Sequence, residues 1–268
     1  MQIRENKEQH KPTRLEILYH GITWAFVGAL YAALFVPVFE VVKGILPLWV
    51  AAICATVAAS AGGALVYSSS QLALLVAMFS NFAVFGYLLY SGEMGSPLAP
   101  ILVGAGLGAI VGALYALAVK ESRIYRAEAI LLAGITVGVG VSVISLIWVL
   151  VVNASLVLLV MVLAPATGFI YERIVDGFIR RYSDILPPIA DGAVAGVVIG
   201  GIVGFGLWIM SGVALENAVP QWQDTIATII ESTPMAIAAA LFSTLLLGML
   251  HEAFRFKFGG FSDQSKNK

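Results

Sequence analysis

The chain has 268 residues, of which 60% are A, V, I, L, M, F, W, Y or C and only 12% are charged. A water-soluble globular protein is closer to half apolar and a quarter charged, and one core of this size could not bury the excess. The formal net charge of −1 argues against a nucleic-acid partner, which would favour a basic protein. The single cysteine, Cys54, excludes an intrachain disulfide and a zinc site built on cysteines. We therefore predict an all-α integral membrane protein, a polytopic bundle of transmembrane helices whose first partner is the lipid bilayer.

The N-terminal segment, residues 1–18, is polar and carries four basic residues. The apolar run that follows is about as long as a membrane span, whereas the apolar part of a secretory signal has roughly 7–15 residues. We expect a cytoplasmic N-terminal segment, then a retained first span, and no separate soluble domain.

The apolar runs predict eight spans, since a helix needs about 20 apolar residues to cross a bilayer. Their approximate limits are residues 19–39, 45–67, 72–90, 99–119, 127–152, 154–171, 189–213 and 235–254. The fifth and sixth spans come from one apolar tract, which as a single helix would be about 67 Å long, twice the membrane thickness. Asn153 and Ser155 interrupt this tract, so we expect a tight hairpin there.

The basic residues support this count and indicate the orientation. With the N-terminus inside, 14 of the 15 lysines and arginines fall on the inner side, and Lys43 is the exception. Cytoplasmic loops are enriched in lysine and arginine in this way. We therefore predict a protein of the cytoplasmic membrane with both ends in the cytoplasm, including a C-terminal tail of residues 255–268.

One hexapeptide, VGALYA, occurs twice, at residues 27–32 and 111–116. It favours a duplicated three-helix unit, whose two copies would have inverted topology because three is odd. Many transporters are built this way, with their sites at the repeat interface. The alternative is a chance match in a chain rich in Gly, Ala, Val and Leu.

Glycines recur at spacing four within two of the predicted spans. The seventh span has Gly192, Gly196 and Gly200, and the fourth has Gly104, Gly108 and Gly112. Small residues at this spacing let helix backbones touch in a membrane. We expect the first, fourth and seventh spans to form the packed centre. The alternative is a substrate path that needs bare backbone.

Two amphipathic segments lie outside the predicted spans. We expect residues 220–230 to lie flat on the outer face and residues 172–186 to form an interfacial helix on the cytoplasmic face. The inner helix either anchors a loop in the headgroups or docks a cytoplasmic partner. The candidate docking residues are Arg173, Phe178, Arg180 and Arg181.

Ionisable side chains are absent from the middle of every predicted span and occur near the span ends. Glu128 and Asp191 begin spans, where the helix dipole favours an acidic group, and both are candidates for a pathway or a polar pair. His20, His251 and Glu252 would gather if the first and last spans were adjacent. His251 and Glu252 are consecutive, so their side chains point to different sides of the helix. The sequence therefore predicts no metal site at these three residues.

Uncharged polar residues within the spans are the other candidates for a pathway or for polar pairing. Asn81 is the costliest to bury without a partner. Tyr31 and Tyr115 carry hydroxyls near the middle of their spans. Pro165, with Thr167 two residues later, predicts a kink that exposes backbone carbonyls.

No motif indicates a catalytic residue or a cofactor, so we expect a protein that is not an enzyme. A transport protein, or the permease subunit of a complex, that moves a small solute or ion is the first hypothesis. The second is a non-catalytic structural subunit that holds other membrane subunits or further copies of itself. The third is a lipid-active membrane enzyme, and its available inner-face residues are His20, Glu128, Asp191, His251 and Glu252.

Overall fold

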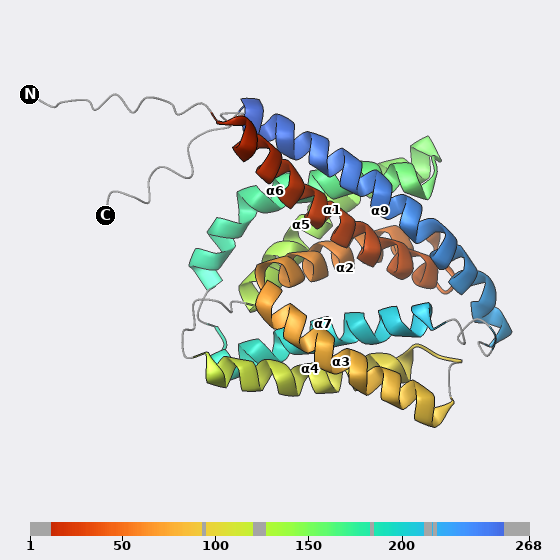
Figure 1. The fold of residues 1–268 in the computed structure, drawn as a ribbon. Helices are drawn as coiled ribbons and strands as arrows, with labels where there is room; N and C mark the ends of the chain where they lie inside the picture. The colour runs from red at the N-terminus through yellow and green to blue at the C-terminus, as the bar shows by residue number, and fades with distance from the viewer. Residues whose placement is uncertain are drawn as a thin grey trace, which may run out of the picture.

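The computed structural model of the chain describes residues 12–92, 95–119, 127–182, 185–211, 216 and 219–254. All regular structure in these residues is helical (Figure 1). Eight of the described helices are long and apolar enough to cross a membrane. The predicted all-helical bundle with eight spans is therefore confirmed.

The spans correspond to eight helices in chain order, the fifth of which ends in a π-helical turn, η1. Their bounds are α1 (Arg14–Lys43), α2 (Leu48–Ser68), α3 (Ser70–Ser91), α4 (Leu98–Ala118), α5 (Ala127–Ile147) with η1 (Trp148–Val152), α6 (Leu156–Tyr182), α7 (Pro188–Met210) and α9 (Pro220–Phe254).

Local sequence accounts for two of the helix ends. α1 begins at a capping box, in which the Thr13 hydroxyl accepts from the Glu16 N–H and the Glu16 carboxylate accepts from the Thr13 N–H. η1 ends at Asn153, which takes a left-handed conformation with φ of 46°. Asparagine tolerates that conformation better than most residues. The predicted hairpin between the fifth and sixth spans is therefore confirmed.

The two amphipathic segments are not separate helices, which corrects the prediction for both. Residues 220–230 belong to α9, a continuous helix of 35 residues that contains Pro234. Ile226 and Ile229 bury their side chains against Trp208 of α7, so this segment packs on the bundle. The inner segment continues α6 without a break as far as Tyr182.

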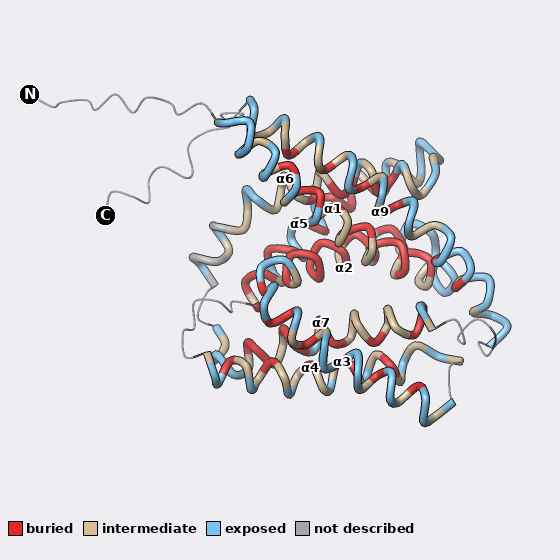
Figure 2. The backbone as a smooth tube through the Cα atoms, in the orientation of Figure 1, coloured by how far each residue is buried: buried red, intermediate tan, exposed pale blue. Residues whose placement is uncertain are grey.

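The helices form two groups, which Figure 1 shows one above the other. The five-helix group contains α1, α2, α5, α6 and α9, and the three-helix group contains α3, α4 and α7. Close pairs within the groups are α1 with α9, α2 with α5, and α4 with α7. α2 is buried along most of its length inside the larger group (Figure 2).

α4 and α7 touch backbone to backbone along a glycine contact that spans several turns. A Cβ added at Gly108 would overlap the carbonyl oxygen of Gly196, and one added at Gly104 would overlap that of Gly200. Gly112 faces Gly192 in the same manner. Dispersion between closely packed backbones stabilises such a pair in lipid, where the hydrophobic effect is absent.

The first span does not join this contact, so the expected centre of spans one, four and seven is wrong. Gly28 of α1 instead packs on α9, where an added Cβ would lie 2.9 Å from the Ala240 carbonyl oxygen. Which helices pair depends on which of their faces of small residues fit together. Hydropathy alone does not reveal that choice.

The two VGALYA segments have different surroundings. α1 packs against α2, but α4 makes no comparable contact with α5 within the described residues, as a duplicated three-helix unit would require. Tyr31 is buried, whereas the Tyr115 hydroxyl donates to Gln71 at 3.2 Å on the exposed side of α3. The glycines of both segments, Gly28 and Gly112, sit at close helix crossings. Both helices need a small residue at these crossings, which explains why the two VGALYA segments share a glycine.

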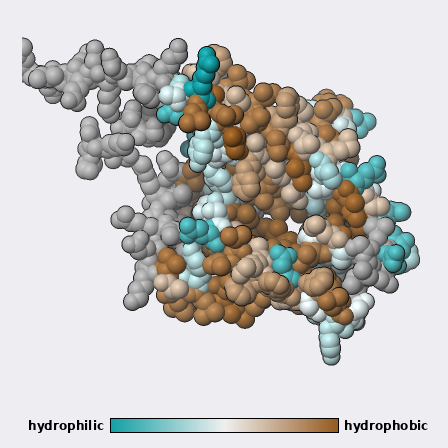
Figure 3. Space-filling model, viewed as in Figure 1, coloured by the Kyte–Doolittle hydropathy of each residue, from teal (hydrophilic) through white to brown (hydrophobic). Residues whose placement is uncertain are grey.

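The outer surface of the bundle is apolar. Figure 3 shows hydrophobic residues over most of the visible face. On α3 alone, Leu74, Phe82 and Leu89 are each at least 70% exposed. Exposing such side chains to water would cost roughly 1.5–3 kcal/mol each, whereas hydrocarbon solvates them without that cost.

Candidate functional site

Tyr31 lies at the centre of a polar cluster inside the five-helix group. Its ring is 2% exposed, and its hydroxyl lies close to those of Thr56 and Ser60 on α2 and Thr167 on α6. Thr56 and Ser60 each donate to the carbonyl one turn back in α2, at 2.7 Å. The structure thus brings together Tyr31 and Thr167, two of the predicted candidates, from helices far apart in sequence.

The hydroxyls of Tyr31 and Thr167 make no hydrogen bond of standard geometry. Further buried polar atoms of this group share that property, among them Ser145 Oγ, Trp148 Nε1 and Tyr171 Oη. We call these five residues the polar row. Folded proteins rarely leave several buried polar groups unpaired in one region without a bound water, ion or ligand to explain them.

The members of the polar row lie at different heights along the five-helix group. We call the end of the bundle that holds the start of α1 and the end of α9 the inner end, after the predicted orientation, and the opposite end the outer end. Trp148 starts η1 at the outer end of α5, and Ser145 lies one turn closer to the centre. Tyr31 lies near the middle of α1, and Tyr171 is one turn beyond Thr167 toward the inner end of α6. Sequence analysis missed Ser145, Trp148 and Tyr171, because serine and aromatic residues are common in any span.

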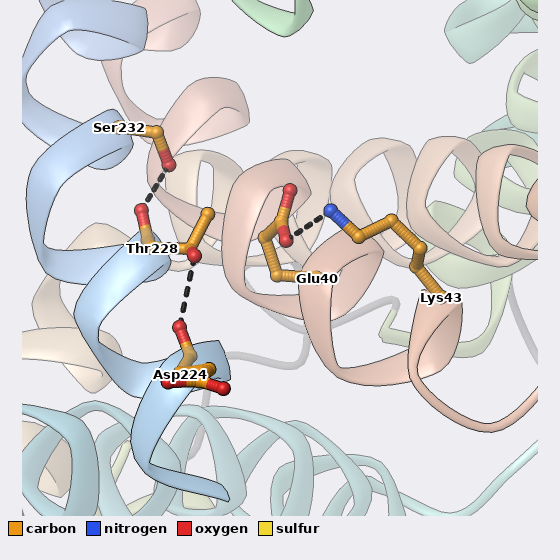
Figure 4. Close-up of polar contacts among 5 residues, drawn as sticks. All are labelled: Glu40, Lys43, Asp224, Thr228 and Ser232. Carbon is orange, nitrogen blue, oxygen red and sulfur yellow. Dashed lines mark hydrogen bonds and ion pairs between the residues drawn. The ribbon is translucent and has the colours of Figure 1, made fainter.

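A small outer pocket of about 190 Å³ adjoins the outer end of the polar row. Glu40, Lys43, Trp148 and Asn153 line it together with apolar residues. Glu40 is buried and forms an ion pair with Lys43, as Figure 4 shows beside the outer part of α9. The hydroxyls of α9 drawn in that view bind their own helix backbone.

Stacked rings separate the outer pocket from the polar cluster at Tyr31. Phe35 lies between Tyr31 and Phe39, with ring centroids 5.8 Å and 5.7 Å away. Phe35 is fully buried, so this column of rings fills the interior along α1 between Phe39, which lines the pocket, and Tyr31.

The inner end of the five-helix group holds a histidine cluster. His20 of α1 and His251 of α9 stack at 5.7 Å between ring centroids. The Trp24 ring stacks on His251 and is tilted by 40° against His20. The potential ligand atoms of His20, His251 and Glu172 all lie within 4.8 Å of one another. His20 Nε2 and His251 Nδ1 are buried without a hydrogen-bond partner.

This cluster corrects the interpretation of the inner-face histidines. α1 and α9 are adjacent, so His20 and His251 do meet. The acid beside them is Glu172 at the inner end of α6, and Glu252 is not part of the group. The prediction of no metal site here rested on Glu252, and the structure places Glu172 beside the two histidines instead.

An apolar groove of about 540 Å³ opens between α6 and α9 and ends at His251. Its lining includes Pro165, Phe169 and Leu247. α6 continues as a helix through Pro165, so this proline shapes the wall of a groove and does not divide the span.

Asp191 and Glu128 meet at the inner end of the contact between the two helix groups. Asp191, in the first turn of α7, is 2% exposed and accepts a hydrogen bond from the Glu128 N–H at 3.4 Å. Its carboxylate thus caps the N-terminus of α5, where a negative charge is favoured. The two residues form a polar contact that joins the two groups, whereas the sequence identified each of them only as a separate candidate.

Asn81 lies on the exposed surface of α3 and not in the interior of the bundle, so its role in pairing with another helix or in lining a path stays a prediction. Its neighbour Ser80 is the buried one, and the Ser80 hydroxyl donates to the Gly104 carbonyl at 3.3 Å. Which of two adjacent residues faces inward depends on the angle at which α3 meets α4.

The candidate docking residues lie on the last turns of α6. The Arg173 guanidinium lies over the Phe169 ring at 5.6 Å, Phe178 is partly buried and Arg181 is exposed. The side chain of Arg180 lies outside the described part of the chain. A partner at this surface stays a prediction.

Comparison with protein-family models, with curated proteins and with solved structures found no match. The class of the protein follows from its own helices. Eight apolar helices and an apolar outer surface define a helical integral membrane protein.

Proposed function

We propose that this protein moves a small, uncharged, hydrogen-bonding solute across the membrane through the five-helix group. The polar row supports this proposal, because its five unpartnered atoms lie at successive depths in one group of helices. Each buried atom without a partner costs about 1–3 kcal/mol. A solute or water that passes along the row would relieve that cost one atom at a time.

The chemistry of the polar row favours a solute without charge. Its members offer hydroxyls and one indole N–H, and none of them carries a full charge at neutral pH. An ion in the middle of the bilayer needs an opposite charge or many oxygen ligands. The nearest described ion pair, Glu40 with Lys43, lies at the outer end and is already matched.

The ring column closes the path in this conformation. Passage requires the Phe35 and Phe39 rings to move away from the line between the outer pocket and Tyr31. Such a rearrangement is the gating step that a transport protein needs.

Reconstitution in liposomes tests the proposed function. Stopped-flow light scattering would measure how fast the liposomes change volume as water, glycerol or urea crosses the membrane. K⁺ salts provide the comparison with a charged solute. We expect at least one uncharged solute to enter faster than in protein-free liposomes, with no increase for K⁺. Equal rates with and without protein across the whole panel would contradict the proposal.

We further propose that both ends of the chain face the cytoplasm of a cytoplasmic membrane. The start of α1 and the end of α9 lie at the same end of the bundle (Figure 1), where His20 meets His251. Together with the excess of lysine and arginine on that side, this favours an inner location. A C-terminal green fluorescent protein fusion should fluoresce, and an alkaline phosphatase fusion at the same point should be inactive. The opposite pair of results would reverse the orientation.

A second candidate function is a membrane enzyme that acts on a lipid. One observation favours it, namely that the apolar groove between α6 and α9 leads to the histidine cluster. An acyl chain in the groove would place its headgroup near His251. Mass spectrometry of bilayer lipids incubated with the protein would test this activity. An unchanged lipid profile would exclude the supplied lipids as substrates.

A further inference from the structure

We infer that His20, Glu172 and His251 bind a divalent transition-metal ion of the Zn²⁺ type at the inner end of the five-helix group. Three helices, α1, α6 and α9, each supply one of these side chains. The inference rests on neither of the proposed functions.

The ligand set is the first support for this site. Two imidazoles and one carboxylate suit Zn²⁺ and its neighbours Co²⁺ and Ni²⁺, whereas Mg²⁺ and Ca²⁺ prefer oxygen ligands alone. No fourth His, Cys, Asp or Glu joins the three within the described residues, so a water molecule would complete a tetrahedron. Three protein ligands and one open position are typical of a zinc ion that binds or activates a further molecule.

The unpartnered nitrogens are the second support. His20 Nε2 and His251 Nδ1 are buried and make no hydrogen bond, which is costly for an imidazole in this location. A metal ion would satisfy both nitrogens together. Packing on Trp24 explains the positions of the rings but leaves these two atoms without a partner.

The geometry needs only a small adjustment. The ligand atoms lie within 4.8 Å of one another. Zinc bonds of about 2.0–2.1 Å place tetrahedral ligand atoms about 3.3 Å apart. Glu172 is exposed, so its carboxylate can close most of this difference by side-chain rotation.

Zinc binding by the purified full-length protein tests the site. The protein carries a purification tag without histidine, is stripped with a chelator in detergent, and is then titrated with Zn²⁺ or Co²⁺. We expect one saturable Zn²⁺ per chain and a Co²⁺ absorption spectrum typical of tetrahedral coordination. His20→Ala and His251→Ala should each weaken binding by more than the roughly 10–100-fold that loss of an outer-shell partner causes.

Two carboxamide variants provide the matched control. Glu172→Gln should weaken Zn²⁺ binding about tenfold or more, whereas Glu252→Gln, beside His251 in sequence, should leave it unchanged. The melting temperature without metal reports folding, and only the wild type and Glu252→Gln should gain stability when Zn²⁺ is added. Absence of saturable binding by the wild type, or equal binding by the histidine variants, would overturn the inference.

A separate observation, the exposure of Asn81, carries a second inference. We propose that two copies of the chain pair along α3, with the Asn81 side chains in contact across a two-fold axis. Asn81 is the twelfth residue of the 22-residue α3, so its amide lies near the middle of the membrane. The exposed residues around it are Leu74, Met78, Phe82 and Phe85.

A second copy is the partner whose chemistry fits this surface best. A carboxamide that faces hydrocarbon without a partner is strongly unfavourable. It carries both a donor and an acceptor, so the same group on a second copy satisfies it across an isologous contact. Interhelical bonds of this kind stabilise membrane helix pairs by about 0.6–2 kcal/mol.

Photobleaching of single fluorescently labelled proteins in lipid bilayers tests the pairing. We expect a dimer for the wild type, and Asn81→Leu should raise its dissociation constant roughly threefold to thirtyfold. Thr136→Val is the matched control, because Thr136 is also exposed in a span but donates to the Leu132 carbonyl of its own helix. A monomer, or a dimer that Asn81→Leu leaves intact, would contradict the pairing.

Discussion

Gly108→Ala is expected to destabilise the protein by about 3 kcal/mol, at the upper end of the range for overpacked interiors. The added methyl group would overlap the Gly196 carbonyl oxygen, which is backbone and cannot rotate away. α4 and α7 must then separate, and the close contact along their whole length weakens. Thermal unfolding in detergent, followed by circular dichroism, measures the effect.

Gly106→Ala is the control for this prediction. Gly106 lies on the same helix, but a Cβ there would meet nothing within 4 Å. Its replacement should change stability by no more than about 0.5 kcal/mol, and alanine's higher helix propensity favours a small gain. Equal stability of the Gly106 and Gly108 variants would show that the two backbones do not touch.

Tyr31→Phe is expected to reduce solute flux at least tenfold while the folded state keeps its stability or gains up to about 1 kcal/mol. The substitution removes only the hydroxyl, and that hydroxyl makes no hydrogen bond of standard geometry with the hydroxyls of Thr56, Ser60 and Thr167 beside it. Removal of a satisfied buried hydroxyl would instead cost stability. Lost flux with preserved stability would therefore show that the Tyr31 hydroxyl serves the solute path and not the packing of the helices.

Tyr115→Phe provides the comparison, because the Tyr115 hydroxyl already donates to Gln71, outside the five-helix group. We expect its flux to equal that of the wild type in the same liposomes. Unchanged flux in Tyr31→Phe would remove the polar row from the path. A large loss of stability in that variant would show that the Tyr31 hydroxyl has a partner after all.

The spans could be predicted from sequence because their signal is local. A run of about 20 apolar residues has few alternatives to a membrane helix, and a left-handed Asn153 is a local property of the turn. The outer part of α9 was mispredicted, because its apolar face resembles that of an interfacial helix. Only the position of Trp208 on α7 shows where that face is buried.

The candidate sites depended on helix pairing, which is not local. His20 and His251 are 231 positions apart, and no spacing rule links either of them to Glu172. Asn81 was assigned to the interior because asparagine is costly in lipid. Its exposed position becomes intelligible only when a second molecule is considered. Tyr31 and Thr167 were identified, but their lack of partners could be seen only in the packed interior.

The glycine contact between α4 and α7 also has a mechanical consequence. With no side chains between them, the two helices cannot slide or tilt against each other without a clash, so they behave as one stiff plate with α3 attached. The plate meets the other helices mainly through α7, at Asp191 on one end, at Ala195 and Ile199 beside α2 and α5, and at Trp208 on the other end. Changes in lateral tension or bilayer thickness would therefore move the plate as a unit about the line of these contacts, and would not bend it.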